Sequence, residues 1–430
     1  MSKFYLIFIV VSCLGCRHTP SVQTEKMLQS LLDQKEYFKL RDRLALDADK
    51  ISPEKNLYLG ANLDNAFNRN EASMEKIHTL LEKYAASTPD STKANLLQIE
   101  TDNYFKTFQY AKSAEVFNDL VAHYQHAVDS TTYAGLKNGA LFTNALSGVP
   151  AQKVNIPVNT TIHWTRDKIG LFEIPLKQGD STYPCIFDTR ANISSITATY
   201  AKKLGLKLLN VSYTVNGTAT DASIKSSLGV ADSLWIGGIL LQHVVFQVMP
   251  DEMLYIGAPY NFSLKVILGY PAIARLREIH ILKNGSMTIP ATPTPGNLNN
   301  LALDGADPIV ACRIGKDTLC FHFDTGAAGP TELYSTYFHK YKAEVLAQGK
   351  LDSIHMGGAG GTMVKVGIYK MKNFHLAIGS QSAVLPEVDV HTDSIGNING
   401  QQFYGSLGQG LIGQFSEMIL NFESMYIDFK

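Results

Sequence analysis

The feature that most constrains this chain is a β-rich segment that occurs twice. In both copies a hairpin ends in Phe-Asp-Thr, at 187–189 in the first and at 323–325 in the second. Each copy later carries an apolar run that ends in glycine, at 266–269 and at 410–413, and then one more hairpin. Duplication of one unit is the simplest account, so we expect two similar β lobes.

The two aspartates of this repeat, Asp188 and Asp324, suggest a chemical role. Carboxylates on matching loops of duplicated lobes can meet across a pseudo-two-fold axis, where they share one proton because both cannot ionise cheaply. The ionised member can then activate a water while the protonated member polarises a carbonyl. Thr189 and Thr325 can tie the loops together by hydroxyl hydrogen bonds, and Gly326 leaves room for the opposite loop.

From about Lys168 to the C-terminus the chain resembles the retropepsin-like aspartic proteases of bacteria in their two-lobe form. The resemblance rests on the paired Asp-Thr motifs and on four further segments: 194–206, 234–238, 244–248 and 407–413. It implies that Asp188 and Asp324 form the catalytic pair, while Thr189, Thr325 and Gly326 shape their loops.

The same resemblance implies an extended polypeptide substrate, held as an added strand. A flap is expected around 213–229, with a glycine-rich counterpart at 357–361. No cofactor and no metal are expected, since phosphate-loop, zinc-protease and serine-hydrolase motifs are all missing from the sequence.

The first loop departs from the family pattern because Arg190 stands where glycine is expected. A guanidinium about 5 Å from the carboxylates would favour their ionised forms by roughly 3 kcal/mol, about two pKa units. Arg190 could instead point outward and contact an acidic substrate residue or a propeptide. Two functions stay open: an aspartic endopeptidase, and a catalytically inactive protease fold that binds peptides or proteins. A purely structural lipoprotein is a third reading.

The residues before the β-rich part predict α-helices, because apolar residues recur at three and four positions between about 24 and 146. Asp64-Asn65-Ala66-Phe67 is echoed 38 residues later by Asp102-Asn103-Tyr104-Phe105. Such a period is typical of a short tetratricopeptide (TPR)-type solenoid, which could hold a protein partner. A helical spacer that packs on the next domain is the alternative.

The predicted fold class is thus α+β multidomain: an N-terminal α-helical, TPR-like region followed by an all-β two-lobe acid-protease fold. The predicted parts are a lipoprotein signal peptide at 1–16, the helical region at 20–150, lobe 1 at 160–290 and lobe 2 at 300–430. The Pro- and Thr-rich stretch at 292–296 is expected to link the lobes.

Residues 1–16 predict export. Lys3 precedes an apolar run at 4–11, which is too short to span a bilayer, and small residues lead to Cys16. The ending Leu-Gly-Cys resembles a bacterial lipobox and would make Cys16 a lipid anchor, although a plain cleaved signal is the alternative. The predicted location is the bacterial cell envelope, lipid-anchored, facing the periplasm or the cell surface. Near-neutral charge (38 basic and 39 acidic residues) argues against nucleic acid as a partner.

Cys312 and Cys320 lie on the two strands of one predicted hairpin. With a three-residue turn, Ile314 would face Thr318 and the two cysteines would face each other. A cross-strand disulfide and two reduced packing cysteines are both compatible with this arrangement.

Overall fold

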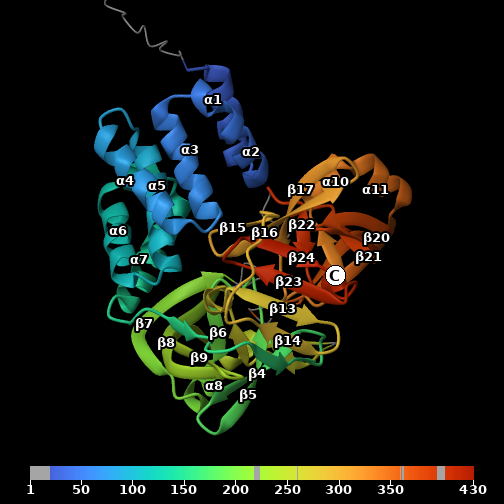
Figure 1. Cartoon of the computed structure of the whole chain (residues 1–430). Coiled ribbons are helices and arrows are strands. Elements are labelled where there is room, and N and C mark those ends of the chain that lie inside the picture. Colours follow the sequence, from blue (N-terminus) through green and yellow to red (C-terminus); the bar gives the residue numbers. More distant parts are fainter. Residues whose placement is uncertain (1–19, 217–222, 259, 359, 361–362, 395–401) are drawn as a thin grey trace, which may run out of the picture.

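The computed structural model describes residues 20–430 except 217–222, 259, 359, 361–362 and 395–401 (Figure 1). Residues 1–16, with the predicted signal peptide and Cys16, lie outside the described part. The tip of the predicted flap at 217–222 and part of the glycine-rich segment at 357–361 also lie outside it. Among the described residues, no helix is both long and apolar enough to cross a membrane.

The first part of the chain is helical. Its helices are α1 (Val22–Asp33), α2 (Tyr37–Asp47), α3 (Pro53–Ala66), α4 (Asn70–Lys83), α5 (Asp90–Lys106), α6 (Tyr110–His123) and α7 (Ser130–Leu146). The side chains of Ser21, Ser52 and Asp129 cap α1, α3 and α7 by accepting hydrogen bonds from backbone N–H groups of the first turn.

The two copies of the repeated helical segment occupy equivalent places, at the ends of α3 and α5. They also touch, because the Asn65 side-chain amide donates to Asp102 Oδ2 at 2.7 Å and to Asn103 Oδ1 at 3.0 Å. Adjacent helices bury Leu80, Leu96 and other apolar residues between them. The TPR-type assignment itself stays a prediction.

Lobe 1 is built on a nine-stranded sheet with the order β1-β9-β6-β12-β5-β4-β8-β7, and β3 pairs with β4. The strands are β1 (Lys153–Asn155), β3 (Thr165–Arg166), β4 (Phe172–Gln178), β5 (Ser181–Phe187), β6 (Ser194–Thr197), β7 (Lys207–Asn216), β8 (Ser223–Ile236), β9 (Ile239–Met249) and β12 (Val266–Leu268).

Lobe 2 is built on an eight-stranded sheet, β15-β16-β17-β22-β18-β21-β20-β19, whose central strands β16-β17-β22-β18-β21 repeat the order β4-β5-β12-β6-β9 of lobe 1. Its strands are β15 (Leu301–Asp304), β16 (Asp307–Ile314), β17 (Asp317–Phe323), β18 (Thr331–Leu333), β19 (Lys350–Met356), β20 (Val364–Ile378), β21 (Gln381–His391) and β22 (Gly405–Leu407). In both lobes the strand that ends in Phe-Asp-Thr pairs in parallel with a short strand, β5 with β12 and β17 with β22. β12 comes from the predicted apolar run at 266–269. The predicted counterpart at 410–413 is wrong, because β22 precedes it and residues 410–412 lie in the short helix α12 (Gln409–Ile412). The predicted two similar lobes are present.

A third, five-stranded sheet joins the lobes, in the order β2-β14-β13-β23-β24. Lobe 1 supplies β2 (Thr160–His163), β13 (Glu278–Leu282) and β14 (Ser286–Ile289), and lobe 2 supplies β23 (Glu417–Asn421) and β24 (Tyr426–Phe429). The lobes meet at the antiparallel pair β13–β23, which extends from Glu278 opposite Asn421 to Leu282 opposite Glu417. The hairpin expected after each glycine run therefore forms, and the two hairpins pair with each other.

The helices pack on both lobes (Figure 1). Just before and within α2, Lys35 and Tyr37 bind the Asp304 carboxylate of β15 at 2.5 and 2.9 Å. At the other end, Phe142 of α7 contacts Tyr213 of β7 edge-to-face, with ring centroids 5.6 Å apart. Contacts at both ends hold the helices beside the β lobes.

The predicted register of the cysteine hairpin is wrong by one residue. Ile314 faces Asp317 rather than Thr318, because only Gly315 and Lys316 form the turn. Cys312 therefore faces Leu319 and packs in the main core, while Cys320 faces Ala311 and packs toward α2. Both cysteines are reduced and buried.

Candidate active site

The two aspartates lie at equivalent strand ends. Asp188 follows β5 and Asp324 follows β17. The backbone N–H of Asp188 donates to the Leu268 carbonyl at 3.1 Å, and that of Asp324 donates to the Leu407 carbonyl at 2.9 Å. Strands β12 and β22 therefore support the two loops directly.

Thr189 and Thr325 join the loops by reciprocal hydrogen bonds across the lobe boundary. The backbone N–H of each threonine donates to the hydroxyl of the other, at 3.0 and 3.1 Å. Each hydroxyl in turn donates to a carbonyl of the opposite lobe, Thr189 to Phe323 at 3.0 Å and Thr325 to Phe187 at 2.7 Å. Both threonines are fully buried, so water does not compete for these bonds.

Gly326 brings the second loop against the first carboxyl group. A Cβ atom at this position would lie only 2.4 Å from Cγ of Asp188. Oδ1 of Asp188 accepts from the backbone N–H groups of Arg190 at 2.9 Å and Ala191 at 3.1 Å, and Oδ1 of Asp324 accepts from that of Gly326 at 2.8 Å. The structure thus brings together Asp188, Asp324, Thr189, Thr325 and Gly326.

Burial and mutual repulsion shift the titration of the pair. Burial raises the pKa of Asp188, and the charge of Asp324 raises it further. Burial also raises the pKa of Asp324, while the nearby Arg190 charge and hydrogen bonds from the Gly326 backbone and the Asp188 side chain oppose that rise. We therefore expect Asp324 to ionise first and Asp188 to keep the shared proton.

Arg190 extends from the first loop to lobe 2. Its Nη1 donates to the Tyr334 hydroxyl at 3.3 Å, and its Nε lies 4.0 Å from Oδ2 of Asp307. The side chain is 19% exposed, and its charge lowers the pKa of Asp324. Arg190 therefore neither points outward nor pairs directly with an aspartate of the dyad; it is held beside the dyad by lobe 2.

Sequence reasoning missed Tyr334, which also contacts the buried His322. His322 is buried, and the centroid of its ring lies 4.6 Å from that of Phe403. Its Nδ1 lies 3.3 Å from the Tyr334 hydroxyl. No local signal in the sequence points to Tyr334 as the partner of Arg190.

Both predicted flaps fall on β-hairpins, as far as these are described. β7 and β8 form the first, and β8 runs on without a break to Ile236, so the segment around Trp235 belongs to the flap strand itself. β19 and β20 form the second. Beyond β19, the Gly360 N–H donates to the Met253 carbonyl of lobe 1 at 2.8 Å. A segment of lobe 2 thus reaches across to lobe 1.

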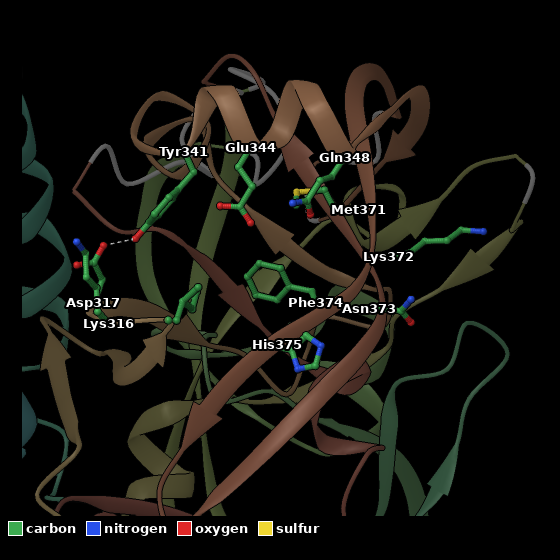
Figure 2. Close-up of a pocket in the computed structure, with 12 residues that line it drawn as sticks. Lys316, Asp317, Tyr341, Glu344, Gln348, Met371, Lys372, Asn373, Phe374 and His375 are labelled. Carbon is green, nitrogen blue, oxygen red and sulfur yellow. Dashed lines mark hydrogen bonds between the residues drawn. The ribbon is translucent and has the colours of Figure 1, made fainter.

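A separate pocket of about 350 Å³ lies in lobe 2 at the turn between β16 and β17, beneath α11 (Lys342–Gln348) (Figure 2). There the Tyr341 hydroxyl donates to the Asp317 carboxylate at 2.6 Å. Asp317 begins β17 and Asp324 follows its end, so about 20 Å of strand separates this pocket from the dyad. In the described ranges, no group of three or more His, Cys, Asp or Glu residues is placed to hold a metal ion.

Comparison with known proteins bears on the first of the two loops. A family model described as aspartyl protease matches residues 174–272, within lobe 1. A search of curated proteins finds no match. Among solved structures, the chain is similar to a retropepsin-like aspartic protease from Rickettsia conorii, with 21% identity over 32% of this chain and 91% of that one and a TM-score of 0.21. Residues 174–272 thus match the aspartyl protease family model, and the paired threonines place the second Asp-Thr loop against the loop that lies in this matched segment.

Proposed function

We propose that the protein is an aspartic-type endopeptidase that hydrolyses peptide bonds with a water activated by Asp188 and Asp324. The observation that carries the proposal is the reciprocal threonine pair, because these hydrogen bonds hold both aspartate loops in one fixed arrangement. A structural lipoprotein would not need this contact between two equivalent loops.

In the proposed mechanism the ionised Asp324 takes a proton from the attacking water. The protonated Asp188 donates to the substrate carbonyl and stabilises the charge that develops on its oxygen. Asp324 then gives its proton to the leaving amine as the C–N bond breaks, and Asp188 takes back a proton from a hydroxyl of the tetrahedral intermediate, which returns the pair to its starting state. Backbone N–H groups already bind one oxygen of each carboxyl, so the other oxygens are left to face the substrate.

A second function, a protease fold that binds peptides without cleaving them, is favoured by one observation. Arg190 lies close enough to lower the pKa of Asp324. If it also kept Asp188 ionised at the working pH, no proton would remain to polarise the carbonyl. The two functions therefore differ in the protonation of the pair and not in the fold.

The test is cleavage of a proteome-derived peptide library by the purified protein between about pH 3 and 7, beside Asp188→Asn and Asp324→Asn. Cleavage by the parent that both variants lose is the expected result. Absence of cleavage at every pH, with cleavage by Arg190→Gly, would establish the binding function instead. Absence of cleavage in both would contradict the endopeptidase proposal.

We further propose that Cys16 carries a lipid anchor in the bacterial cell envelope and that the helical region holds a protein partner. The lipobox-like ending supports the first part, and the predicted solenoid supports the second. Labelling of the intact protein with a fatty-acid analogue, lost in Cys16→Ala, is the expected outcome for the anchor. Retention of the label in Cys16→Ala would refute it.

A further inference from the structure

Lobe 1 has an apolar face beside the dyad. Its central members are Leu171, Ile186, Met249 and Ile267. Ala328, four residues after Asp324, and Met363 of lobe 2 pack against this face. Contact with lobe 2 from two directions shows that the face borders the space between the lobes.

Lobe 2 has polar residues at the equivalent positions. The Phe-Asp-Thr motifs, at 187–189 and 323–325, and the strand pairings align the lobes residue by residue: Ile186 faces Ile267 across β5–β12, as His322 faces Ser406 across β17–β22. On this alignment the four apolar residues of lobe 1 correspond to Asp307, His322, His391 and Ser406.

His322, His391 and Ser406 belong to a row that crosses the sheet. Ser406 pairs with His322 on one side and with Glu332 on the other, and Glu332 pairs with Asp389. His391 lies two residues beyond Asp389 on the same face of β21. We call His322, Ser406, Glu332, Asp389 and His391 the polar row.

Part of the polar row lacks hydrogen-bond partners. Within the described ranges, Oδ1 of Asp389 and both ring nitrogens of His391 have none, although these residues are only 3% and 1% exposed. His391 Nε2 lies 3.8 Å from Glu332 Oε2, too far for a hydrogen bond. Buried polar atoms are nearly always paired, so these unpaired atoms indicate a place for a bound group.

The charges near the row are also unbalanced. Asp307, Glu332 and Asp389 bring three carboxyl groups, and Arg190 contacts only the first, at 4.0 Å. Lys370 stands opposite Asp389 across β20–β21, but its ammonium group binds Glu387 at 2.8 Å, and Lys35 binds Asp304 at 2.5 Å. The Glu332 side chain is 27% exposed, so a group can approach the row from solvent at this residue.

We infer that the polar row is a specificity site for a basic side chain, lysine or arginine, on the part of the substrate that lies over lobe 2. The apolar face of lobe 1 would take an apolar side chain on the other side of the cleaved bond. This inference rests on the proposed peptide-binding cleft. An ammonium or guanidinium group supplies N–H donors, and their hydrogen bonds can be accepted by the unpaired Asp389 oxygen, the partly exposed Glu332 carboxylate and a neutral His391 nitrogen.

The test uses uncleavable peptides, so that binding and hydrolysis are judged separately. Peptides with a reduced scissile amide carry lysine or norleucine, which have equally long carbon chains, at one position at a time. We expect one position at which lysine lowers the dissociation constant about tenfold or more relative to norleucine. Lysine preference without hydrolysis of the matching amides would keep this inference and refute the endopeptidase proposal. Hydrolysis without lysine preference would keep the endopeptidase proposal and refute this inference, and it would indicate that ordered water alone fills the row.

Substitutions in the polar row test whether its residues cause the preference for lysine over norleucine. Asp389→Asn and Glu332→Gln should each reduce the lysine-to-norleucine ratio about tenfold, whereas Glu344→Gln, the same charge change on exposed α11, should leave it unchanged. Glu332→Lys should abolish the preference, because the new ammonium group occupies the row. An unchanged ratio in folded Glu332→Gln and Glu332→Lys would overturn the inference, even if Asp389→Asn fails to fold.

Discussion

Gly326→Ala tests whether the two aspartate loops touch as described. The added Cβ would lie 2.4 Å from Cγ, 2.5 Å from Oδ2 and 2.7 Å from Oδ1 of Asp188. Carbon atoms in contact are about 3.5 Å apart, so the carboxyl group or the loop has to move by about 1 Å. Gly326 has no positive φ, so this clash, and not backbone strain, would cause the effect.

A displacement of about 1 Å at a reacting group can cost about 100-fold in rate, and we expect kcat/KM to fall by at least that factor. Overpacking should also lower the free energy of unfolding by about 1–3 kcal/mol. The measurements are initial rates on a cleaved peptide and denaturant unfolding.

Gly329→Ala is the matched control, since nothing lies within 4 Å of its added Cβ and its φ is not positive. It should keep kcat/KM within about threefold and stability within about 0.5 kcal/mol. Parental activity in Gly326→Ala would refute the close approach of the loops.

Three further predictions follow from the same contacts. Thr325→Val removes a buried hydroxyl that both donates and accepts a hydrogen bond, so the free energy of unfolding in denaturant titrations should fall by about 2 kcal/mol or more. Thr325→Ser keeps the hydroxyl and should retain stability. Equal stability of the two variants would contradict the threonine pair. Arg190→Gly removes a charge that lowers the pKa of Asp324, so the acid limb of the pH–rate profile should move to higher pH; a shift to lower pH would contradict this electrostatic account. Burial raises the pKa of Glu332 to about 7, so the stability that this group contributes is complete below about pH 4 and is lost as pH rises through 7. In Glu332→Gln the free energy of unfolding should fall less over this pH range, by up to about 3 kcal/mol. An unchanged dependence of the free energy of unfolding on pH would exclude Glu332 as the source of the loss.

The parts of the fold that could be predicted from sequence are those with a local or repeated signal. Helix periodicity indicates the helical region, and the duplicated Phe-Asp-Thr motif indicates two lobes. The pairing of β13 with β23 joins residues about 140 positions apart and leaves no local trace. The cysteine register failed for a smaller reason, because a two-residue turn instead of a three-residue turn shifts every cross-strand partner by one.

The site divides in the same way. Asp188, Asp324, Thr189, Thr325 and Gly326 are contiguous within their motifs, so each could be named from the chain alone. The polar row could not, because its members come from β17, β18, β21 and β22 and meet only through strand registers. The direction of Arg190 likewise depends on residues of the opposite lobe.

The five-stranded sheet described above has a kinetic and an evolutionary consequence. Because both halves of the cleft belong to one polypeptide and share backbone hydrogen bonds through β13 and β23, assembly of the dyad is a first-order process that dilution does not reverse. Specific activity should therefore be constant from nanomolar to micromolar protein. Each aspartate loop can also acquire a substitution that the other loop lacks. In a symmetric pair of identical subunits, by contrast, every substitution appears in both loops. An arginine in one loop opposite a glycine in the other is a change that only this covalent arrangement permits.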